Sequence, residues 1–540
     1  MKGMVVCPQP RAAEAGARVL EAGGNAFDAA LATAFMQMVV DPFMCGPGGM
    51  GTANIYVAAT RENAVIDFFN RAGSKVRPDL WLKDLKGYSP LTQYYLFEDH
   101  RNELGYTSVM TPGTIAGLAE INKNYGMMKW GDLIAPAIGI ARDGFQVPHQ
   151  LVFMLNKPAQ PAVSDMLMRV KANKACSQIY LRPDGRSIQP GNRLVNRDMA
   201  HTLEVLADEG PDSFYHGSLA CIIAEDFAAN GGDITAEDLA NYRPRKSKPV
   251  STTYRGHTVI SNLPPGGGAC VIELLNILEG FELGKLEHNG IEHLDILARA
   301  MLVTQSDRDK YLGDPDFVSV PLETVFLSKE YAQEQQKMIK ENIGKTTGTP
   351  IREEGTTNLC VVDEMGNTIA MTHTLGSSSG VVTPGLGFMY NNSMKQFNPV
   401  QGKPNSLVPG KARLTGMCPS IVFKDGKPAF VVGAPGGNVI ISSVLQSICN
   451  VIDWGMTALE AVSVPRIHRD ADPLVYVDAE IREDICEELR QRGHQVAHQI
   501  DSFSAAMISR SQVIRVLPDG RLDGGSDPRG AYAGVARSRG

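Results

Sequence analysis

The feature that most constrains the fold is a change in the sequence pattern near residue 350. Residues 357–362 and 368–375 are rich in strand-forming side chains, and the turn-forming segment 363–367 separates them. Two such runs around a short turn predict a β-hairpin. Residues 420–424 and 429–432 predict a second hairpin around Asp425-Gly426. The last third of the chain is therefore expected to contribute paired strands to the core.

The chain before this change alternates helical patterns with Gly- and Pro-rich junctions. Residues 11–21 and 27–40 have helical apolar spacing, and the second stretch is apolar enough to predict a buried helix. Residues 120–345 are predicted to be mainly helical, and helical spacing returns at 438–454 and 481–491. This mixture favours sheets packed together with helices outside them. Length alone, at 540 residues, would suggest about three or four domains.

Composition excludes several classes of function. The net charge is −7 and no long basic run is present, which argues against a nucleic-acid partner. The nine cysteines include no Cys-x-x-Cys pair, so we expect neither a disulfide framework nor a zinc site. No apolar run is long enough to span a membrane, and the first residues lack the apolar core of a signal peptide. We therefore expect a cytoplasmic protein without a membrane partner, a metal or a cofactor.

A glycine cluster, Gly46-Pro-Gly-Gly-Met-Gly51, superficially resembles a dinucleotide-binding loop. Such a loop follows a strand and opens a helix. Here the order is reversed, because a predicted helix precedes the cluster and a strand-like stretch follows it. The cluster is better interpreted as a tight turn with close backbone packing.

The dipeptide Gly355-Thr356 stands directly before the first predicted hairpin. A threonine hydroxyl is a weak nucleophile unless a base takes its proton, and the residue's own α-amine is one such base. That amine has a pKa of about 8, so part of it is neutral at physiological pH. It exists only if the chain is cut before Thr356. By itself the dipeptide is a very weak signal, because it is far more often the beginning of an ordinary strand.

Further motifs accompany this dipeptide along the chain. Thr356-Thr-Asn-Leu-Cys-Val-Val-Asp-Glu-Met-Gly-Asn367 is followed by Thr372-His-Thr-Leu375 and Tyr390-Asn-Asn392. The others, in order, are Gly23-Gly-Asn-Ala-Phe-Asp-Ala-Ala30, Gly46-Pro-Gly-Gly49, Thr111-Pro-Gly-Thr-Ile-Ala-Gly-Leu118, Pro264-Pro-Gly-Gly-Gly268, Asp307-Arg-Asp-Lys-Tyr-Leu-Gly-Asp-Pro-Asp316, Gly433-Ala-Pro-Gly-Gly437 and Gly525-Ser-Asp-Pro-Arg529. Together they resemble the gamma-glutamyltranspeptidase family over nearly the whole chain.

The resemblance implies an N-terminal-nucleophile hydrolase, which is an α+β fold with a four-layer αββα sandwich. It implies one precursor cut between Gly355 and Thr356 into a large chain, residues 1–355, and a small chain, residues 356–540. The two chains would remain together as one heterodimeric catalytic unit, and a dimer of such heterodimers is left open. The partner would be a small-molecule amide substrate.

The resemblance also assigns roles to individual residues. Thr356 would be the nucleophile and, through its amine, the general base. Thr374 would orient Thr356, although without the resemblance it would be an ordinary strand threonine. Gly436 and Gly437 would supply the backbone N–H groups of an oxyanion hole, and a plain strand-to-helix turn would accommodate the same glycines.

The residues expected to bind the substrate depart from the family pattern. A γ-glutamyl group carries an α-ammonium, which needs an acid, and an α-carboxylate, which needs a base. Gln396 stands where that acid is expected, with Lys395 beside it, and Arg71 is displaced by two positions from the expected arginine. The substrate-binding positions carried over are Arg71, Gly376, Asn392, Ser393, Lys395, Gln396, Thr415 and Gly416. Gly376 replaces an asparagine, and Thr415-Gly416 keeps one of two expected hydroxyls.

The catalytic residues of the family are retained, whereas the residues expected to bind the α-ammonium and α-carboxylate are altered. This combination predicts a self-processed amidohydrolase for a small carboxylate-bearing amide. An oxamate-type amide, which releases ammonia, fits this outline, with a cationic pocket formed by Lys395, Arg71 or Arg413. One alternative is a glutathione hydrolase or γ-glutamyltransferase whose γ-glutamyl-binding residues stand at other positions than those assigned above. Another is a cephalosporin-acylase-like amidase. A non-catalytic homologue is a further alternative, against which the retention of Thr356, Thr374, Gly436 and Gly437 weighs.

Overall fold

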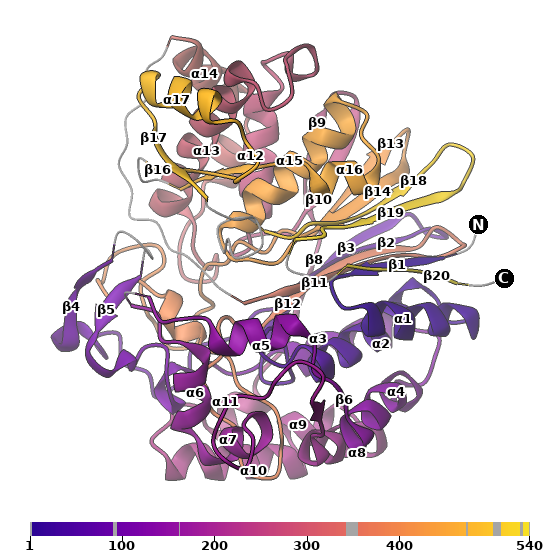
Figure 1. Ribbon diagram of the computed structural model, residues 1–540, viewed down its shortest axis with the longest axis vertical. Helices are drawn as coiled ribbons and strands as arrows, with labels where there is room; N and C mark the ends of the chain where they lie inside the picture. The colour runs from indigo at the N-terminus through magenta and orange to yellow at the C-terminus, as the bar shows by residue number, and fades with distance from the viewer. Residues whose placement is uncertain are drawn as a thin grey trace.

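The computed structural model describes residues 3–89, 94–160, 162–341, 355–470, 474–499, 509–529 and 533–538. Two antiparallel sheets are stacked on one another, and helices cover the outer face of each sheet (Figure 1). The chain therefore folds as helix, sheet, sheet and helix layers, which confirms the predicted αββα sandwich.

The first sheet has seven strands in the order β20-β1-β11-β12-β2-β3-β8. It joins the two ends of the chain, because the first strand pairs with the last. Its strands are β1 (Met4–Cys7), β2 (Met50–Val57), β3 (Glu62–Phe68), β8 (Arg245–Ser247), β11 (Thr357–Val362), β12 (Thr368–Thr374) and β20 (Gly534–Arg537).

The second sheet has six strands in the order β19-β18-β14-β13-β10-β9. Its central hairpin is the second one predicted from the sequence. Its strands are β9 (Val250–Tyr254), β10 (His257–Ser261), β13 (Ser420–Lys424), β14 (Lys427–Gly433), β18 (Gln512–Val516) and β19 (Leu522–Ser526).

The helices form two outer layers, one below and one above the sheets in Figure 1. The layer over the first sheet contains α1 (Pro10–Glu21), α2 (Ala26–Val40), α3 (Thr114–Tyr125), α4 (Trp130–Asp143), α5 (His149–Asn156), α6 (Met166–Ala172), α7 (Lys174–Tyr180), α8 (Arg197–Glu209), α9 (Asp212–Tyr215), α10 (Ser218–Ala229) and α11 (Ala236–Ala240). The layer over the second sheet contains α12 (Gly268–Leu278), α13 (Ile291–Tyr311), α14 (Lys329–Lys340), α15 (Val439–Asp453), α16 (Ala458–Ser463) and α17 (Glu483–Gln491).

Three smaller sheets are also present among the described residues. They are formed by β4 (Leu85–Tyr88) with β5 (Tyr95–Phe97), by β6 (Phe145–Gln146) with β7 (Arg193–Leu194), and by β15 (Ile467–Arg469) with β16 (Leu474–Val477) and β17 (Gln495–His498). No helix in the described ranges is both long enough and apolar enough to cross a membrane.

The side chains of β11 alternate between two cores, as expected for a strand buried on both faces. Leu359 and Val361 belong to the core shared with the first helical layer. Cys360 and Val362 belong to the smaller core between the two sheets. By the same alternation, Thr357 faces the helical layer and Thr356 faces the space between the sheets. This alternation positions the predicted nucleophile between the two sheets.

Several local predictions are confirmed. Both hairpins form, as β11–β12 and β13–β14, and the predicted helices form as α1, α2, α15 and α17. The glycine cluster at 46–51 joins α2 to β2, and a Cβ atom at Gly49 would lie 2.4 Å from the Thr374 carbonyl oxygen. The cluster is therefore a closely packed turn, which opens a strand rather than a helix.

The prediction that residues 120–345 are mainly helical is confirmed, although the region also contains short strands. Among these, β9 and β10 form a hairpin, and its signal is the β-branched run in 250–253 and 257–261 around Arg255-Gly256. The length-based count of three or four domains is wrong for the described residues, because strands from the whole chain meet in the two stacked sheets.

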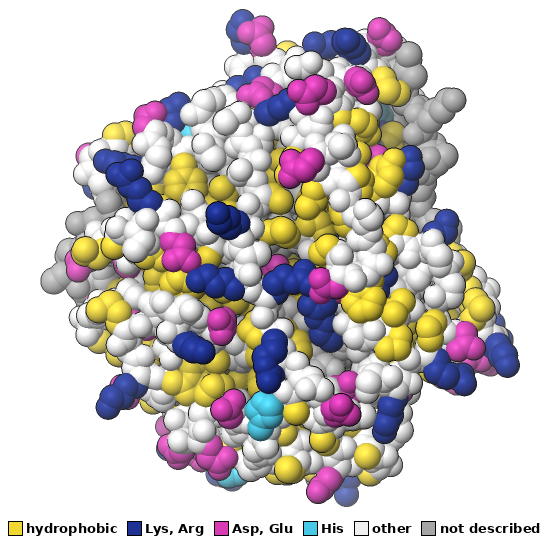
Figure 2. Space-filling model, turned by 180° about the vertical axis from the view of Figure 1, so that it is seen from behind, with side chains coloured by type: hydrophobic (Ala, Val, Ile, Leu, Met, Phe, Trp, Pro, Cys, Tyr) yellow, Lys and Arg dark blue, Asp and Glu magenta, His cyan; other side chains and the backbone are white. Residues whose placement is uncertain are grey.

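Figure 2 shows acidic and basic side chains interspersed over the face seen from behind.

Candidate active site

The Gly355–Thr356 bond lies at the beginning of β11, next to the end of β12. The Thr356 hydroxyl oxygen lies 2.5 Å from the Gly355 carbonyl oxygen and 3.1 Å from Thr374 Oγ1. The Thr374 hydroxyl donates to the Gly355 carbonyl at 2.5 Å and accepts a hydrogen bond of 2.8 Å from the Gly376 N–H. Both threonines are buried. The carbonyl before Thr356 is thus held beside two hydroxyl groups.

Glycine is required on the amino side of this bond. Gly355 has a φ of +84°, and a Cβ atom there would lie 2.1 Å from the Gly376 carbonyl oxygen. Gly376 has a φ of +72°, and its Cβ would lie 2.6 Å from Asn392 Oδ1. Only glycine adopts such a backbone readily. The replacement of the family's asparagine by Gly376 is therefore part of the local backbone conformation.

The Gly436-Gly437 pair forms the turn between β14 and α15. Their φ values are +125° and +74°. The turn is brought to the Thr356 end of the first sheet because Gly433, at the end of β14, packs on Asn358, and a Cβ at Gly433 would lie 2.2 Å from Asn358 Nδ2. Asn358 is two residues after Thr356 and faces the same side of β11. The contact of the two sheets thus places the glycine pair and Thr356 in the same region.

The segment containing Thr415 and Gly416 packs against the glycine pair. A Cβ at Gly416 would lie 2.1 Å from the Gly437 carbonyl oxygen. The Thr415 N–H donates to the Pro265 carbonyl at 2.9 Å, and its hydroxyl accepts from the Met417 N–H at 3.3 Å. The loss of a hydroxyl at Gly416 therefore has a structural cause, since the neighbouring backbone occupies the space that a side chain would need.

Asn392 and Ser393 hold the segment that follows β12. Asn392 Oδ1 accepts from the Ser377 N–H at 3.0 Å, and its Nδ2 donates to Ser377 Oγ at 3.1 Å. Ser393 Oγ accepts from Asn70 Nδ2 at 2.9 Å. The Asn392 contacts thus join two segments that both follow β12, whereas the Ser393 contact joins its segment to Asn70, just after β3.

Lys395 is part of a buried ionic group, which we call the Glu103 cluster: Glu103, Arg169, Lys395 and His100. Lys395 Nζ lies 2.7 Å from Glu103 Oε2, Arg169 Nη2 lies 2.9 Å from the same oxygen, and His100 Nδ1 lies 2.9 Å from Oε1. Burial alone would raise the pKa of Glu103, but the charges of Lys395 and Arg169 hold it well below its usual range. Glu103 is therefore ionised in the folded protein.

Arg169 connects this cluster to the Gly355 region. Its Nη1 donates to the carbonyls of Ser377 and Ser378, the latter at 2.8 Å. A small cavity beside Gly355 is lined by Phe43, Met44, Met154, Met166, Arg169, Gly355 and Ser377, among others. Sequence reasoning missed both Glu103 and Arg169, because neither lies in a quoted motif and each is far along the chain from Lys395.

The other predicted cations are engaged elsewhere. Arg71 Nη1 lies 2.6 Å from Asp314 Oδ2, and Arg413 donates to the Leu414 carbonyl at 2.9 Å. Gln396 Nε2 lies 3.5 Å from the hydroxyl of Tyr94, whose ring lies under Lys395 Nζ at 3.8 Å from the centroid. Among these cations, Arg169 of the Glu103 cluster lines the cavity beside Gly355, whereas Arg71 pairs with Asp314.

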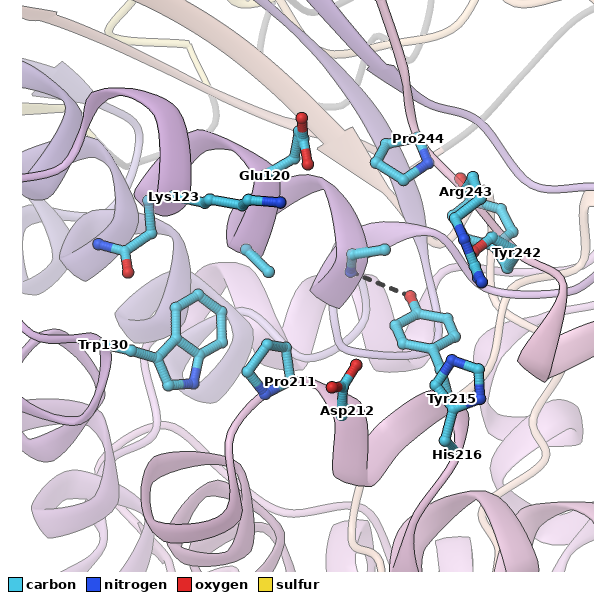
Figure 3. Close-up of a pocket in the computed structure, with 13 residues that line it drawn as sticks. Glu120, Lys123, Trp130, Pro211, Asp212, Tyr215, His216, Tyr242, Arg243 and Pro244 are labelled. Carbon is cyan, nitrogen blue, oxygen red and sulfur yellow. Dashed lines mark hydrogen bonds between the residues drawn. The ribbon is translucent and has the colours of Figure 1, made fainter.

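A separate pocket of about 490 Å³ lies in the outer helical layer (Figure 3). Trp130 and Pro211 lie on one side of it, and Tyr215 and Arg243 on the other. The Tyr215 hydroxyl accepts from the Ala116 N–H at 3.0 Å, the contact dashed in Figure 3. None of the predicted site residues lines this pocket, so it is distinct from the Thr356 region.

A group of possible metal ligands occurs in the small β15–β16–β17 region. Within the described ranges, Glu483, Cys486 and His498 place ligand atoms within 4.8 Å of one another. His498 Nδ1 already bonds Glu483 Oε2 at 2.7 Å, and Arg490 bonds the other Glu483 oxygen at 2.8 Å. The group belongs to α17 and β17 and contains none of the predicted site residues.

Comparison with known proteins agrees with this geometry. The family described as Gamma-glutamyltranspeptidase matches residues 12–536. An Acylase ACY 1 proenzyme of Pseudomonas sp. (strain SE83) is 36% identical over 547 residues, covering 100% of this chain and 94% of its own length. A Glutathione hydrolase proenzyme of Escherichia coli (strain K12) is 35% identical over 550 residues, covering 98% and 90%.

Solved structures show the same relationship. Cephalosporin acylase from Bacillus halodurans has a TM-score of 0.87 at 30% identity, covering 100% of this chain and 96% of its own. Gamma-glutamyltranspeptidase of Helicobacter pylori has a TM-score of 0.55 at 33% identity, covering 63% and 91%. The chain therefore belongs to the gamma-glutamyltranspeptidase family and is a hydrolase of amide bonds with the N-terminal-nucleophile hydrolase fold.

Proposed function

We propose that the protein is a self-processed amide hydrolase whose nucleophile is Thr356. The observation that carries this proposal is the contact of the Thr356 and Thr374 hydroxyls with the Gly355 carbonyl, at 2.5 Å each. Attack by Thr356 Oγ1 on that carbonyl carbon forms a C–O bond and breaks the C–N bond. The hydroxyl proton passes to the nitrogen, which becomes the free α-amine of Thr356. Water then hydrolyses the resulting ester, which releases the Gly355 carboxylate and restores the Thr356 hydroxyl.

The same groups support catalysis after processing. The α-amine of Thr356 takes the proton of its own hydroxyl, because its pKa of about 8 leaves part of it neutral. The hydroxyl attacks the substrate amide, the Gly436 and Gly437 N–H groups stabilise the oxyanion, and the amine leaves with a proton. Thr374 orients the nucleophile at 3.1 Å. Water releases the acyl group and restores Thr356.

Processing into residues 1–355 and 356–540 is supported by the nature of two relatives. Both the Pseudomonas acylase and the Escherichia coli glutathione hydrolase are named proenzymes. Gly355 also has the conformation that only glycine adopts readily, which leaves its carbonyl accessible to the two hydroxyls.

We further propose that the acyl group carries a carboxylate and no α-ammonium. The Glu103 cluster places two cations, Arg169 and Lys395, against one carboxylate, so that these cations outnumber the carboxylate. Gln396, in place of the family's acid, offers no charge to an ammonium. Substrates of this class range from oxamate to glutaryl amides, the latter being γ-glutamyl amides without the amino group.

Glutathione hydrolysis is the second candidate. A glutathione hydrolase proenzyme matches this chain at 35% identity, close to the 36% of the acylase proenzyme. Glu103 is also a carboxylate in this region, although two cations neutralise it. The choice between the two candidates therefore depends on whether the site recognises an α-ammonium.

A denaturing gel with N-terminal sequencing tests the processing step. The expected result is two bands, with the smaller one beginning Thr-Thr-Asn-Leu. A single full-length band from freshly purified and from aged wild-type protein would contradict self-cleavage.

Two matched substrates test specificity. Glutaryl p-nitroanilide and γ-glutamyl p-nitroanilide differ only in the α-amino group, and oxamate tests the smallest member of the proposed class. We expect kcat/KM for the glutaryl compound to exceed that for the γ-glutamyl compound by at least about 10-fold, since an unpaired buried ammonium costs more than 1 kcal/mol. The reverse preference would identify the protein as a γ-glutamyl hydrolase.

A further inference from the structure

On one side of the beginning of β11, no strand among the described residues is paired with it. β12 pairs with β11 from Thr357 onward, opposite His373. On the other side, β1 pairs only from Val6 with Cys360 to Met4 with Val362. Beyond Cys7 the chain continues through Pro8, which has no N–H, and Pro10 opens α1. The three residues that follow Thr356 are therefore left without a β1 ladder.

Two glutamine side chains occupy this gap. Gln9 Nε2 donates to Thr357 Oγ1 at 3.1 Å, and Gln37 Nε2 lies 3.0 Å from the same hydroxyl. Gln37 Nε2 also lies 3.3 Å from the Asn358 carbonyl oxygen, which a β1 strand would otherwise have bonded. Gln9, Gln37 and Thr357 are at most 3% exposed.

The glutamines are themselves held by buried partners. Gln37 Nε2 donates to Gln9 Oε1 at 2.7 Å, and Gln9 Nε2 donates to Asp41 Oδ2 at 2.5 Å. His373 Nε2 lies 2.8 Å from Gln37 Oε1. Burial lowers the pKa of His373 to about 3, so this imidazole is neutral. We call Gln9, Gln37, Thr357 and Asp41 the β11 clamp.

The proposed cut before Thr356 would change what holds the beginning of β11 in place. In the uncut chain, Gly355 continues the backbone before Thr356. In the cut protein Thr356 is a chain terminus, and the terminal residues of a strand open easily unless something holds them. Catalysis requires the amine and hydroxyl of that terminus to stay in place, because a displacement of about 1 Å costs about 100-fold in rate.

We infer that the β11 clamp is a positioning device that keeps the new N-terminus in its catalytic position after self-cleavage. The clamp contacts Thr357 on the helical face of β11, so its members are positioning residues for Thr356 and do not touch the substrate. This inference rests on the proposed cut before Thr356.

Two substitutions of Thr357 test it, with a control in the same layer. Thr357→Val removes the hydroxyl at nearly constant shape, and Thr357→Ser keeps the hydroxyl. Thr33→Val removes another buried hydroxyl, which bonds the Ala29 carbonyl within α2 at 2.7 Å. Each variant is processed to completion, and kcat and KM for the glutaryl anilide are measured beside the melting temperature.

We expect Thr357→Val to be cut but to lose at least about 10-fold in kcat, with KM within about twofold of wild type, because substrate contacts are intact. Thr357→Ser is expected to recover most of kcat, and Thr33→Val to resemble wild type. If Thr357 contributed only to stability, Thr357→Val would lower the melting temperature and leave kcat unchanged, which would contradict the inference.

Hydrogen exchange gives a second readout of the same inference. Amides of 357–359 should exchange faster in cut Thr357→Val than in cut wild type, and the difference should be smaller in the uncut Thr356→Ala background. If Thr357→Val does not fold, Gln37→Met replaces it in both measurements. If a cut, folded variant showed unchanged kcat and unchanged exchange, the inference about the β11 clamp would be wrong and the proposed function would stand. If wild-type protein were not cut, both the proposed function and the inference would be wrong.

Discussion

The two ends of the candidate site are built in different ways. Around Gly355, Gly376, Gly416 and the Gly436-Gly437 pair, the backbone is so close to its neighbours that side chains are excluded. Around Glu103, Arg169 and Lys395, long side chains are buried and paired by charge. The first end is suited to holding a reacting carbonyl, which needs fixed N–H and O–H groups. The second end carries the buried cations that the proposed recognition of a substrate carboxylate requires.

The largest expected effect comes from removing the nucleophile. Thr356→Ala should leave the chain uncut and lower amide hydrolysis by at least about 10³-fold, as for other covalent nucleophiles. The measurement is a denaturing gel with an initial-rate assay. Thr368→Val, which removes a hydroxyl at the far end of β12, should be cut and active. Cleavage of Thr356→Ala would show that the bond is broken by another group.

The second effect tests the backbone-built end. Gly416→Ser restores the hydroxyl that the family pattern leads one to expect, but its Cβ would lie 2.1 Å from the Gly437 carbonyl oxygen. We expect the displaced glycine turn to lower kcat by about 100-fold, the cost of losing one oxyanion donor. Gly416→Ala should behave in the same way, because the Cβ causes the collision. Unchanged kcat in both variants would mean that this turn moves freely.

The third effect tests the charge-built end. Gln396→Asp returns an acid to the position where the family pattern predicts one, next to Lys395. We expect the ratio of kcat/KM for γ-glutamyl to glutaryl p-nitroanilide to rise by about 10-fold, because a charge-assisted hydrogen bond to the ammonium becomes available. Gln396→Asn is the uncharged control and should leave the ratio unchanged. An equal ratio in both variants would place ammonium recognition elsewhere.

The smallest effect concerns the pH dependence of stability. Burial lowers the pKa of His373 from 6.5 to about 3 in the folded protein. As the pH falls, the His373 imidazole is therefore protonated in the unfolded chain at a higher pH than in the folded protein. The free energy of unfolding should therefore decrease below pH 6.5, by about 1 kcal/mol between pH 6.5 and 5.5 from this group. Chemical denaturation of wild type and His373→Gln measures the difference. Parallel pH profiles would show that His373 titrates normally in the fold.

Local patterns predicted much of the architecture. Runs of strand-forming residues around a turn, in 357–375 and in 420–432, predicted both central hairpins. The helical patterns of 11–21 and 27–40 predicted α1 and α2. The hairpin of β9 and β10 was missed, although its β-branched residues and the Arg255-Gly256 turn were visible. It was missed because the surrounding helical pattern outweighed a short strand signal.

The sequence by itself determined the identity of the chemistry-bearing residues and the order of the motifs. The sequence alone shows glycine at 355, 376, 416 and 436–437 and threonine at 356 and 374. The order of the motifs that contain them is enough to show the resemblance to a family. Only the tertiary structure showed which charged side chains form ion pairs. Glu103 lies nearly 300 residues from Lys395 and pairs with it at 2.7 Å, and Arg71 pairs with Asp314 instead of remaining free. Backbone conformation is encoded locally, whereas the energy of a buried charge depends on partners that only packing brings together.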